Sequence, residues 1–484
     1  MSPSDAVINP SSSYDPSNAA KRLLPWLVAV AFFMESLDTT ILNTAVPAIS
    51  SALSITPLSM KAVLASYTLS LAVFIPISGW MADRFGTRRV FAAAIGLFTL
   101  GSLLCGISNN VHLLVACRIL QGCGGAMMVP VGRLTLVRTF AKSDLLRAMS
   151  FVSIPALIAP MLGPIAGGLI VRYLQWRFIF FLNIPIGLAG LILVYLHLPD
   201  FREEQTHPLD IVGLILFGSG IGLLSYVLEI FGEHTLSGRE ISGLLALSLV
   251  LLAGYGLHAH SISFPLLQLR LFSIRTFRAA VSGSFFTRLG IGGVPFLLPL
   301  LYQVGLGFTP IQSGLLVMPQ AIAAMSMKTI LPWLLRRVGY RRILVSNTLV
   351  LGVLLMVFAT IGLRTPVWFI VLQAFLYGAF TSLQYSSMNT LVYADIADKD
   401  ASSASSIAST MQQMSISFGV ATAGLATAFF VGTSRTSPDE MIQGIHKALV
   451  ALGVLTILST IVFRSLRRGD GDDVSQHKVL HPGG

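Results

Sequence analysis

The chain has 484 residues, of which 54% are hydrophobic and only 11% are charged, and its mean hydropathy is +0.77. This number of charged residues is too small to cover the surface of a water-soluble protein of this length. The composition therefore excludes a water-soluble protein. The net charge of +11 does not indicate nucleic-acid binding, because the basic residues lie in short clusters between apolar segments, where membrane-orientation signals are found.

Apolar segments of 18 or more residues recur along the chain, and each is long enough to cross a bilayer. The sequence therefore predicts an all-α polytopic membrane protein with fourteen spans. In chain order these are expected at 24–47, 61–82, 90–108, 111–134, 149–172, 178–197, 211–230, 241–259, 277–303, 311–335, 342–362, 366–391, 404–431 and 445–464. The polar residues before the first span contain no apolar core, which predicts that no signal peptide is cleaved.

Lys and Arg residues predict the orientation of the spans. If the N-terminus is cytoplasmic, twenty Lys and Arg residues in loops and at span ends lie on the cytoplasmic side and seven on the other. Cytoplasmic segments of membrane proteins carry an excess of these residues. Both termini are therefore predicted to be cytoplasmic.

A short basic segment occurs twice, as GWMADRFGTRRVF at 79–91 and as LPWLLRRVGYRRIL at 331–344. The two copies align at a shift of 253 residues, with one reversal of charge where Asp83 meets Arg336. A second match, GPIAGG with GVATAG, occurs at a shift of 256. Two matches at nearly one shift predict two related six-helix halves in parallel orientation, with two helices inserted between them.

This repeat divides the chain into six expected parts. They are a cytoplasmic tail at 1–22, an N-terminal six-helix half at 23–200, a two-helix insertion at 201–262, a cytoplasmic linker at 263–276, a C-terminal six-helix half at 277–465 and a second cytoplasmic tail at 466–484.

The sequence carries no pattern typical of an enzyme. The nine histidines are scattered over loops, span ends and the tail, and neither an HExxH nor a Walker A sequence is present. The three cysteines lie in apolar runs without a CxxC, which is typical of buried hydrophobic residues. We therefore expect a protein without enzymatic activity, metal site or bound cofactor.

Four motifs resemble those of the major facilitator superfamily, in its 14-span drug:proton antiporter branch of the EmrB/QacA type. They are LDTTILNTAVP at 37–47, GWMADRFGTRR at 79–89, RILQGCGGAMM at 118–128 and APMLGPIAGG at 159–168. The resemblance covers residues 22–465, and the chain is also similar to multidrug exporters of Gram-negative bacteria. It implies the major facilitator fold and proton-coupled export of small amphipathic drugs across the inner membrane by alternating access, with the proton gradient as the energy source and a link to antibiotic resistance.

Ionisable residues within spans are costly and are candidates for function. Asp38 and Arg118 lie at a similar depth, because the first span is expected to run outward and the fourth inward. Glu35 lies one turn from Asp38 on the same face. We predict that these three residues couple transport to protons, with a static salt bridge between two helices as the alternative.

Two motifs are candidates for gating. In the basic segment, Gly86 permits a tight turn, and the resemblance implies that Asp83 holds the cytoplasmic side closed at the seam between the halves. Positive-inside orientation alone is the alternative. In the fifth span, small residues and prolines allow close helix approach and bending, and the resemblance assigns them to antiport. The expected gating residues are Asp83, Arg84, Gly86, Arg88, Gly163, Pro164, Gly167 and Gly168.

Polar residues deep in other spans are candidates for the substrate cavity, although such residues also join helices to one another. They are Asn43, Arg288, Lys328, Gln384, Asn389 and Gln412. The deep basic residues outnumber the acidic ones, so a proton-coupled transporter of an organic anion or metabolite on the same fold is the alternative function. The expected partners are the lipid bilayer, a small-molecule substrate and protons, and a periplasmic adaptor is left open.

Overall fold

A computed structural model of the chain describes residues 18–140, 142–203, 207–230, 237–397, 400–431, 438–467 and 469–472. These residues form sixteen α-helices and no strand. The helices are α1 (Asn18–Ala52), α2 (Met60–Phe85), α3 (Thr87–Ile107), α4 (Val111–Thr139), α5 (Lys142–Tyr173), α6 (Phe178–Phe181), α7 (Asn183–His197), α8 (Ile211–Ile230), α9 (Gly238–Ser261), α10 (Arg275–Ile291), α11 (Val294–Leu300), α12 (Pro310–Val338), α13 (Tyr340–Phe358), α14 (Val367–Leu391), α15 (Ala401–Val431) and α16 (Pro438–Arg464).

Thirteen helical segments of the described chain are long and apolar enough to cross a membrane. Helices α6 and α7 together make one of these segments, and α10 and α11 make another with the π-turn Leu301–Gly305 that follows them. The span expected at 149–172 lies in α5, whose side chains are described only in part. The all-α fold with many spans that the sequence predicts is therefore confirmed.

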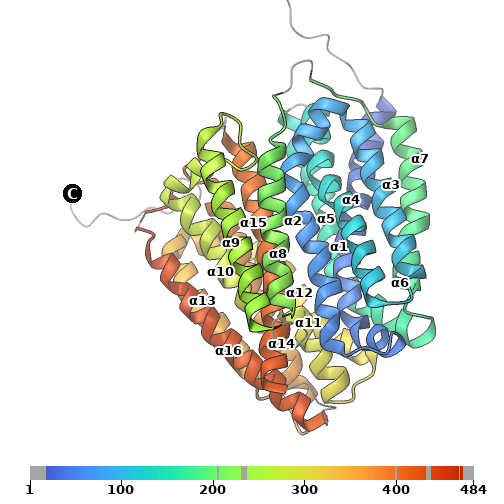
Figure 1. The fold of residues 1–484 in the computed structure, drawn as a ribbon, viewed down its shortest axis with the longest axis vertical. Helices are drawn as coiled ribbons and strands as arrows, with labels where there is room; N and C mark the ends of the chain where they lie inside the picture. Colours follow the sequence, from blue (N-terminus) through green and yellow to red (C-terminus); the bar gives the residue numbers. More distant parts are fainter. Residues whose placement is uncertain are drawn as a thin grey trace, which may run out of the picture.

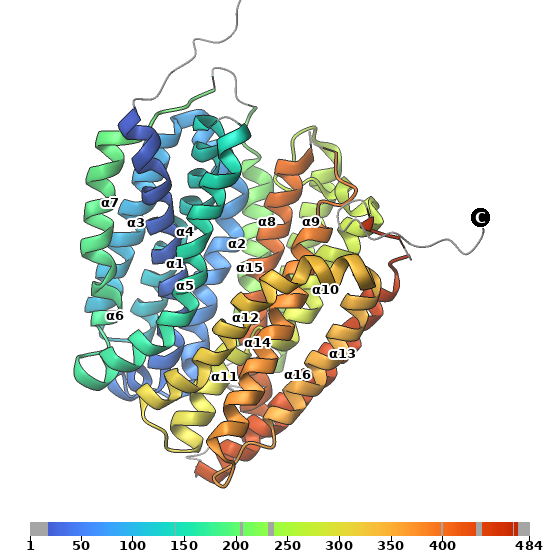
Figure 2. The ribbon, with the colours of Figure 1, turned by 180° about the vertical axis from the view of Figure 1, so that it is seen from behind.

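The helices form two bundles that lie side by side, α1–α7 in one and α10–α16 in the other (Figures 1 and 2). Helices α8 and α9 pack against each other, and α8 also contacts α2 of the first bundle and α15 of the second. The connection from α9 to α10 contains a short 3₁₀ turn at Leu269–Ser273. Asp210, just before α8, fixes this connection by accepting a hydrogen bond from the backbone N–H of Leu266 at 3.0 Å.

The repeated basic segments form the same backbone turn in both bundles. Gly86 alone separates α2 from α3, and Gly339 alone separates α12 from α13. Their φ angles are 93° and 77°, in the region that glycine adopts most readily. We call the side of the molecule that carries these two turns the turn face, and the side that carries the connections 53–59 and 306–309 the far face. The turn face lies toward the top of Figure 1.

The two bundles contact each other in the half of the molecule toward the far face. Here α5 packs on α12, α2 on α15 and α1 on α11. The Gln303 Nε2 donates to the carbonyl oxygen of Thr44 at 2.9 Å, and the Ser417 Oγ donates to that of Ala65 at 3.1 Å. The two bundles are therefore closed against each other at the far face.

Candidate functional site

A buried ion pair joins α1 to α4. The Nη1 of Arg118 lies 2.5 Å from the Oδ2 of Asp38, and these residues are only 1% and 2% exposed. The structure thus places in contact the two residues for which the sequence predicts a similar depth in the membrane. An ion pair at this depth is stable only if additional hydrogen bonds satisfy the remaining polar atoms.

Polar side chains from three helices supply those hydrogen bonds. The Nε2 of Gln121 donates to Asp38 Oδ1 at 2.9 Å, and its Oε1 accepts from Arg118 at 2.7 Å. The Nδ2 of Asn183, at the start of α7, donates to the same Asp38 Oδ1 at 3.0 Å. The hydroxyl of Ser102 on α3 accepts from both amides, at 2.7 Å from Gln121 and 3.2 Å from Asn183. The Asp38 carboxylate therefore accepts hydrogen bonds from two side-chain amides in addition to its ion pair with Arg118.

An aromatic ring covers the other side of the arginine. The Arg118 guanidinium carbon lies 4.2 Å from the centre of the Tyr67 ring, and Tyr67 is fully buried on α2. Such a contact stabilises a desolvated cation. The residues of this arrangement come from α1, α2, α3, α4 and α7. A change in the charge of Asp38 would therefore alter contacts between these five helices.

Glu35 lies one turn from Asp38 along α1 and is half-buried. It belongs to a polar face of this helix that also carries Ser36, Thr39 and Asn43, all of which remain partly exposed. The amide of Asn43 donates to the backbone carbonyl of Thr39 at 3.2 Å. This face is therefore open to a polar ligand, while Asp38 points away from it into the bundle.

Among the residues that the structure describes, the predicted gating residue Asp83 contacts Arg138 of the first bundle and the backbone of Glu203 in the segment that follows it. Its Oδ1 accepts from the Nη2 of Arg138 on α4 at 2.8 Å, and the same nitrogen lies 2.8 Å from the Oε1 of Glu203. The backbone N–H of Arg88 donates to the Oδ1 of Asp200 at 3.0 Å, and Arg84 is exposed. In this conformation, the described residues show no contact of Asp83 across the seam between the bundles.

The glycines of α5 face two different helices. A Cβ at Gly163 would lie 2.8 Å from the Cβ of Thr40, so this glycine allows α5 to pack closely on α1. A Cβ at Gly167 would lie 2.6 Å from the carbonyl oxygen of Ile41 on the same helix. Close packing between helices needs small residues at such positions. These two glycines therefore serve packing within the first bundle.

Gly168 and Pro164 face the second bundle instead. A Cβ at Gly168 would lie 2.7 Å from the carbonyl oxygen of Pro310 at the start of α12. In return, Gly314 of α12 approaches the carbonyl group of Pro164 too closely for any side chain. This reciprocal contact is part of the far-side closure.

Five of the expected cavity residues, all but Asn43, separate into three groups. Arg288 and Gln412 lie together, with the Nη2 of Arg288 3.4 Å from the Oε1 of Gln412, whereas Lys328 and Asn389 are exposed. Gln384 is fully buried and joins α14 to α13. Its Oε1 accepts from Asn347 at 2.7 Å, and its Nε2 donates to Thr348 at 2.8 Å. Gln384 therefore has the contacts of a residue that holds helices together.

Sequence reasoning missed Ser102, Gln121, Asn183 and Asp200. Gln121 stands in the RILQG motif, three residues after Arg118 and on the same helical face, so this spacing could have identified it. Ser102 and Asn183 come from helices that only the fold brings to Asp38.

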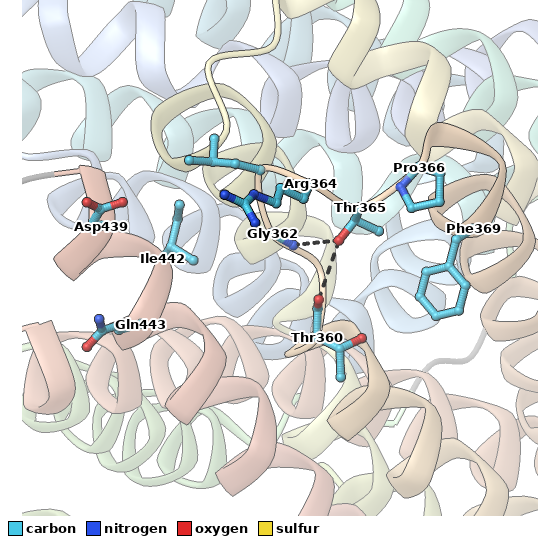
Figure 3. Close-up of a pocket in the computed structure, with 10 residues that line it drawn as sticks. Thr360, Gly362, Arg364, Thr365, Pro366, Phe369, Asp439, Ile442 and Gln443 are labelled. Atoms are coloured by element: carbon cyan, nitrogen blue, oxygen red, sulfur yellow. Dashed lines mark hydrogen bonds between the residues drawn. The ribbon is translucent and has the colours of Figure 1, made fainter.

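A hollow on the far face lies away from this site (Figure 3). It is formed by the connection between α13 and α14, which includes Arg364 and Thr365, and by the start of α16, which includes Asp439 and Gln443. It opens at the surface of the second bundle and not between the bundles. It therefore has no direct connection to the Asp38–Arg118 pair.

Comparison with known proteins identifies the family. Residues 28–420 match the model of the Major Facilitator Superfamily. The chain is 44% identical over 405 residues to "Putative multidrug resistance protein MdtD" of Serratia proteamaculans, covering 84% of this chain and 85% of the relative. It is also 44% identical over 417 residues to the protein of the same name from Escherichia coli O7:K1, covering 86% and 88%.

Solved structures share the fold at low sequence identity. The POT family transporter PepTSo superposes with a TM-score of 0.69 at 15% identity, covering 94% of this chain and 98% of that one. A bacterial homologue of the human lysosomal transporter Spinster, in an inward-facing and occupied conformation, gives a TM-score of 0.65 at 12% identity, covering 93% and 97%. This chain therefore belongs to the major facilitator superfamily and is a multi-pass membrane transporter, not an enzyme.

Proposed function

We propose that the protein is a proton-coupled antiporter that exports small amphipathic compounds across the bacterial inner membrane by alternating access. The observation that carries the proposal is the buried Asp38–Arg118 pair, since an ionisable carboxylate inside a membrane bundle is a functional candidate by default. The names of the relatives, which refer to multidrug resistance, support export of drug-like compounds.

The positive-inside pattern supports an orientation with the turn face in the cytoplasm. The basic turns at Gly86 and Gly339 and both ends of the chain would then be cytoplasmic, and the far face would be periplasmic. The structure, closed on its far side, would correspond to an inward-facing state. A periplasmic adaptor, if one cooperates, would dock on the far face.

Proton coupling follows from the contacts of Asp38. In the far-closed state its carboxylate is paired with Arg118 and accepts hydrogen bonds from Gln121 and Asn183. When the far side opens, a proton from the periplasm would neutralise this carboxylate and remove most of its attraction to Arg118. Return to the inward-facing state would release the proton to the cytoplasm and restore the pair. Substrate would travel in the opposite direction in the alternate half of the cycle.

The test is Asp38→Asn in proteoliposomes with an imposed pH gradient, assayed with cationic, anionic and neutral fluorescent compounds. Asn keeps the shape of the side chain but cannot exchange a proton. We expect gradient-driven accumulation to be lost while the protein remains folded and inserted. The control is Asp439→Asn, which changes an exposed acid on the far face. Accumulation by Asp38→Asn at the wild-type rate, or wild-type accumulation that persists after an ionophore collapses the gradient, would contradict the proposal.

A further inference from the structure

We propose that Arg288 forms a binding site for the negatively charged group of an amphipathic organic anion, within the second bundle. The proposal rests on the proposed transport function, because it assigns a substrate class to the same path. Its basis is the difference between two buried arginines, one in each bundle.

Arg288 is as deeply buried as Arg118 but has a different set of partners. It is 2% exposed on α10, and its Nε donates to the hydroxyl of Ser284 at 3.0 Å. Its Nη2 lies 3.4 Å from the Oε1 of Gln412 on α15, and the ring centre of Tyr385 on α14 lies 3.6 Å from its guanidinium carbon. In the part of the chain that the structure describes, no Asp or Glu oxygen forms an ion pair with it.

A buried guanidinium without a carboxylate is costly within a membrane. Arg118 meets this cost with Asp38, whereas the neighbours of Arg288 are neutral. Neutral hydrogen bonds and a ring contact compensate only part of the lost hydration. The Arg288 guanidinium would therefore be stabilised by binding a negatively charged group of a ligand.

In the internal repeat, the position equivalent to Arg288 in the first bundle is occupied by an acidic residue. At the shift of 253 residues, Arg288 corresponds to Glu35 on α1. The spans that carry them, Leu23–Ala52 and Arg275–Gly305, are equivalent first spans of the two bundles. The two bundles therefore carry opposite charges at the same depth, and the partly exposed polar face of α1 has a basic counterpart on α10.

A second cation lies at the same level. Helices α12 and α14 run in the same direction and approach closely where a Cβ at Gly378 would lie 2.5 Å from the Cα of Gln320. One turn further, the hydroxyl of Ser382 donates to the carbonyl oxygen of Ala324 at 2.8 Å. The next turn of both helices, about 6 Å along, places Lys328 beside Ser386, the neighbour of Tyr385.

Lys328 is exposed, and the structure shows no ion pair for it among the described residues. Among the described residues, the second bundle thus offers two positive charges at one depth, and neither forms an ion pair with an acid. The planar fork of Arg288 suits bidentate contact with a carboxylate, sulfonate or phosphate oxygen pair.

The surroundings of Arg288 define the rest of the ligand. Tyr385 contacts the guanidinium, Phe285 lies three residues before Arg288 on α10, and Met411 is next to Gln412 on α15; all three are only partly buried. Aromatic rings and a flexible thioether make an adaptable apolar surface. The Tyr385 ring covers one face of the guanidinium and leaves the edge of the fork for the anion, so the aromatic body of a ligand would pack beside this ring. The expected ligand is therefore an organic anion with an aromatic body.

The test compares two dyes that share a xanthene body, the anion fluorescein and the cation rhodamine 123. Binding to the purified full chain in detergent is measured by fluorescence anisotropy, without a proton gradient. We expect fluorescein to bind wild type and Arg288→Gln to lower its affinity about tenfold or more, with a smaller loss for Arg288→Lys. Rhodamine 123 should bind Arg288→Gln at least as well as wild type. The matched control is Arg239→Gln, an exposed arginine at the start of α9, which should leave fluorescein binding unchanged.

Three results would overturn the site. Wild type does not bind fluorescein, or Arg288→Gln binds it as wild type does, or Arg288→Gln loses both dyes equally, which would show that Arg288 only ties α10 to α14 and α15. Binding needs no gradient, so failure of proton coupling is seen separately. A selective loss of fluorescein in Arg288→Gln, together with wild-type pumping by Asp38→Asn, would uphold the anion site and refute the coupling proposal.

Discussion

Replacing Gly168 with Ala tests whether close approach of α5 and α12 closes the far side. A Cβ at this position would lie 2.7 Å from the carbonyl oxygen of Pro310 and 2.9 Å from the Cα of Ile311. Both atoms belong to the backbone, so no side chain can rotate away. The two helices must separate by about 0.7 Å before the shorter contact reaches 3.4 Å, where ordinary van der Waals contact begins.

The energetic effect is large compared with the difference between two transport states. Inserting a methyl group into a close-packed site costs roughly 1–3 kcal/mol. Conformations of a two-state protein commonly differ by only a few kcal/mol. If the cost applies only to the far-closed state, the ratio of far-closed to far-open molecules should fall roughly 5- to 150-fold. Gly168→Ala should therefore favour the far-open state.

The assay is the distance between spin labels at two exposed positions near the far face, His112 at the start of α4 in the first bundle and Leu363 in the connection between α13 and α14 in the second. We expect Gly168→Ala to add or enlarge a population at longer distances. The control is Gly243→Ala on α9, where a Cβ would meet nothing within 4 Å. If Gly168→Ala is folded and its distance distribution overlays that of wild type, the contact between α5 and α12 does not hold the far side closed.

Three further variants test other parts of the structure. Asp83→Asn should increase the far-closed population, because the contacts of Asp83 with described residues in this state lie within the first bundle and Glu203, so a contact across the seam would form in the other state. Spin labels on turn-face connections would show no change if the basic turn only sets topology. Gly163→Leu should reduce both transport and thermal stability, since it separates α5 from α1, and wild-type values would exclude that packing role. Burial raises the pKa of Asp210, but hydrogen bonds from His258 and from the backbone N–H groups of Gly213 and Leu266 outweigh it and lower the pKa below its ordinary value. Its stabilising effect is therefore full above the ordinary pKa and is lost as pH falls, so wild type should lose more thermal stability than Asp210→Asn between about pH 6 and pH 3, and parallel curves would refute this.

Depth arguments predicted the central pair of the site from the sequence alone. Asp38 and Arg118 are ionisable residues in long apolar runs, and the rise of a helix places them at one level when the spans run in opposite directions. The repeated glycine turn could also be predicted from the sequence, because Gly86 and Gly339 lie between helical segments at equivalent positions. In both cases the signal is local spacing, which the sequence carries directly.

Contacts between distant helices could not be predicted in the same way. Asn183 follows an apolar stretch and has no local pattern that directs it to Asp38, 145 residues away. Likewise, Gly163 and Gly168 look alike in the sequence, yet one faces α1 and the other α12. Which face of α5 meets which neighbour depends on how the bundles pack, and bends at the prolines of this helix shift that face.

The two bundles share backbone turns but carry opposite charges at equivalent positions, and this has a consequence for energetics. Asp83 corresponds to Arg336, and Glu35 corresponds to Arg288. Proton handling would then belong to the first bundle and recognition of substrate charge to the second. Exporting one monoanion while importing one proton moves two positive charges inward, worth about 4.6 kcal/mol per 100 mV, whereas exporting a monocation for one proton moves none. A potassium diffusion potential, negative inside, should therefore accelerate export of an anion at constant pH and leave export of a cation unchanged. If the potential changes the export rate of an anion and of a cation equally, the charge of the substrate does not contribute to the charge moved per cycle, and the proposed division between the bundles is wrong.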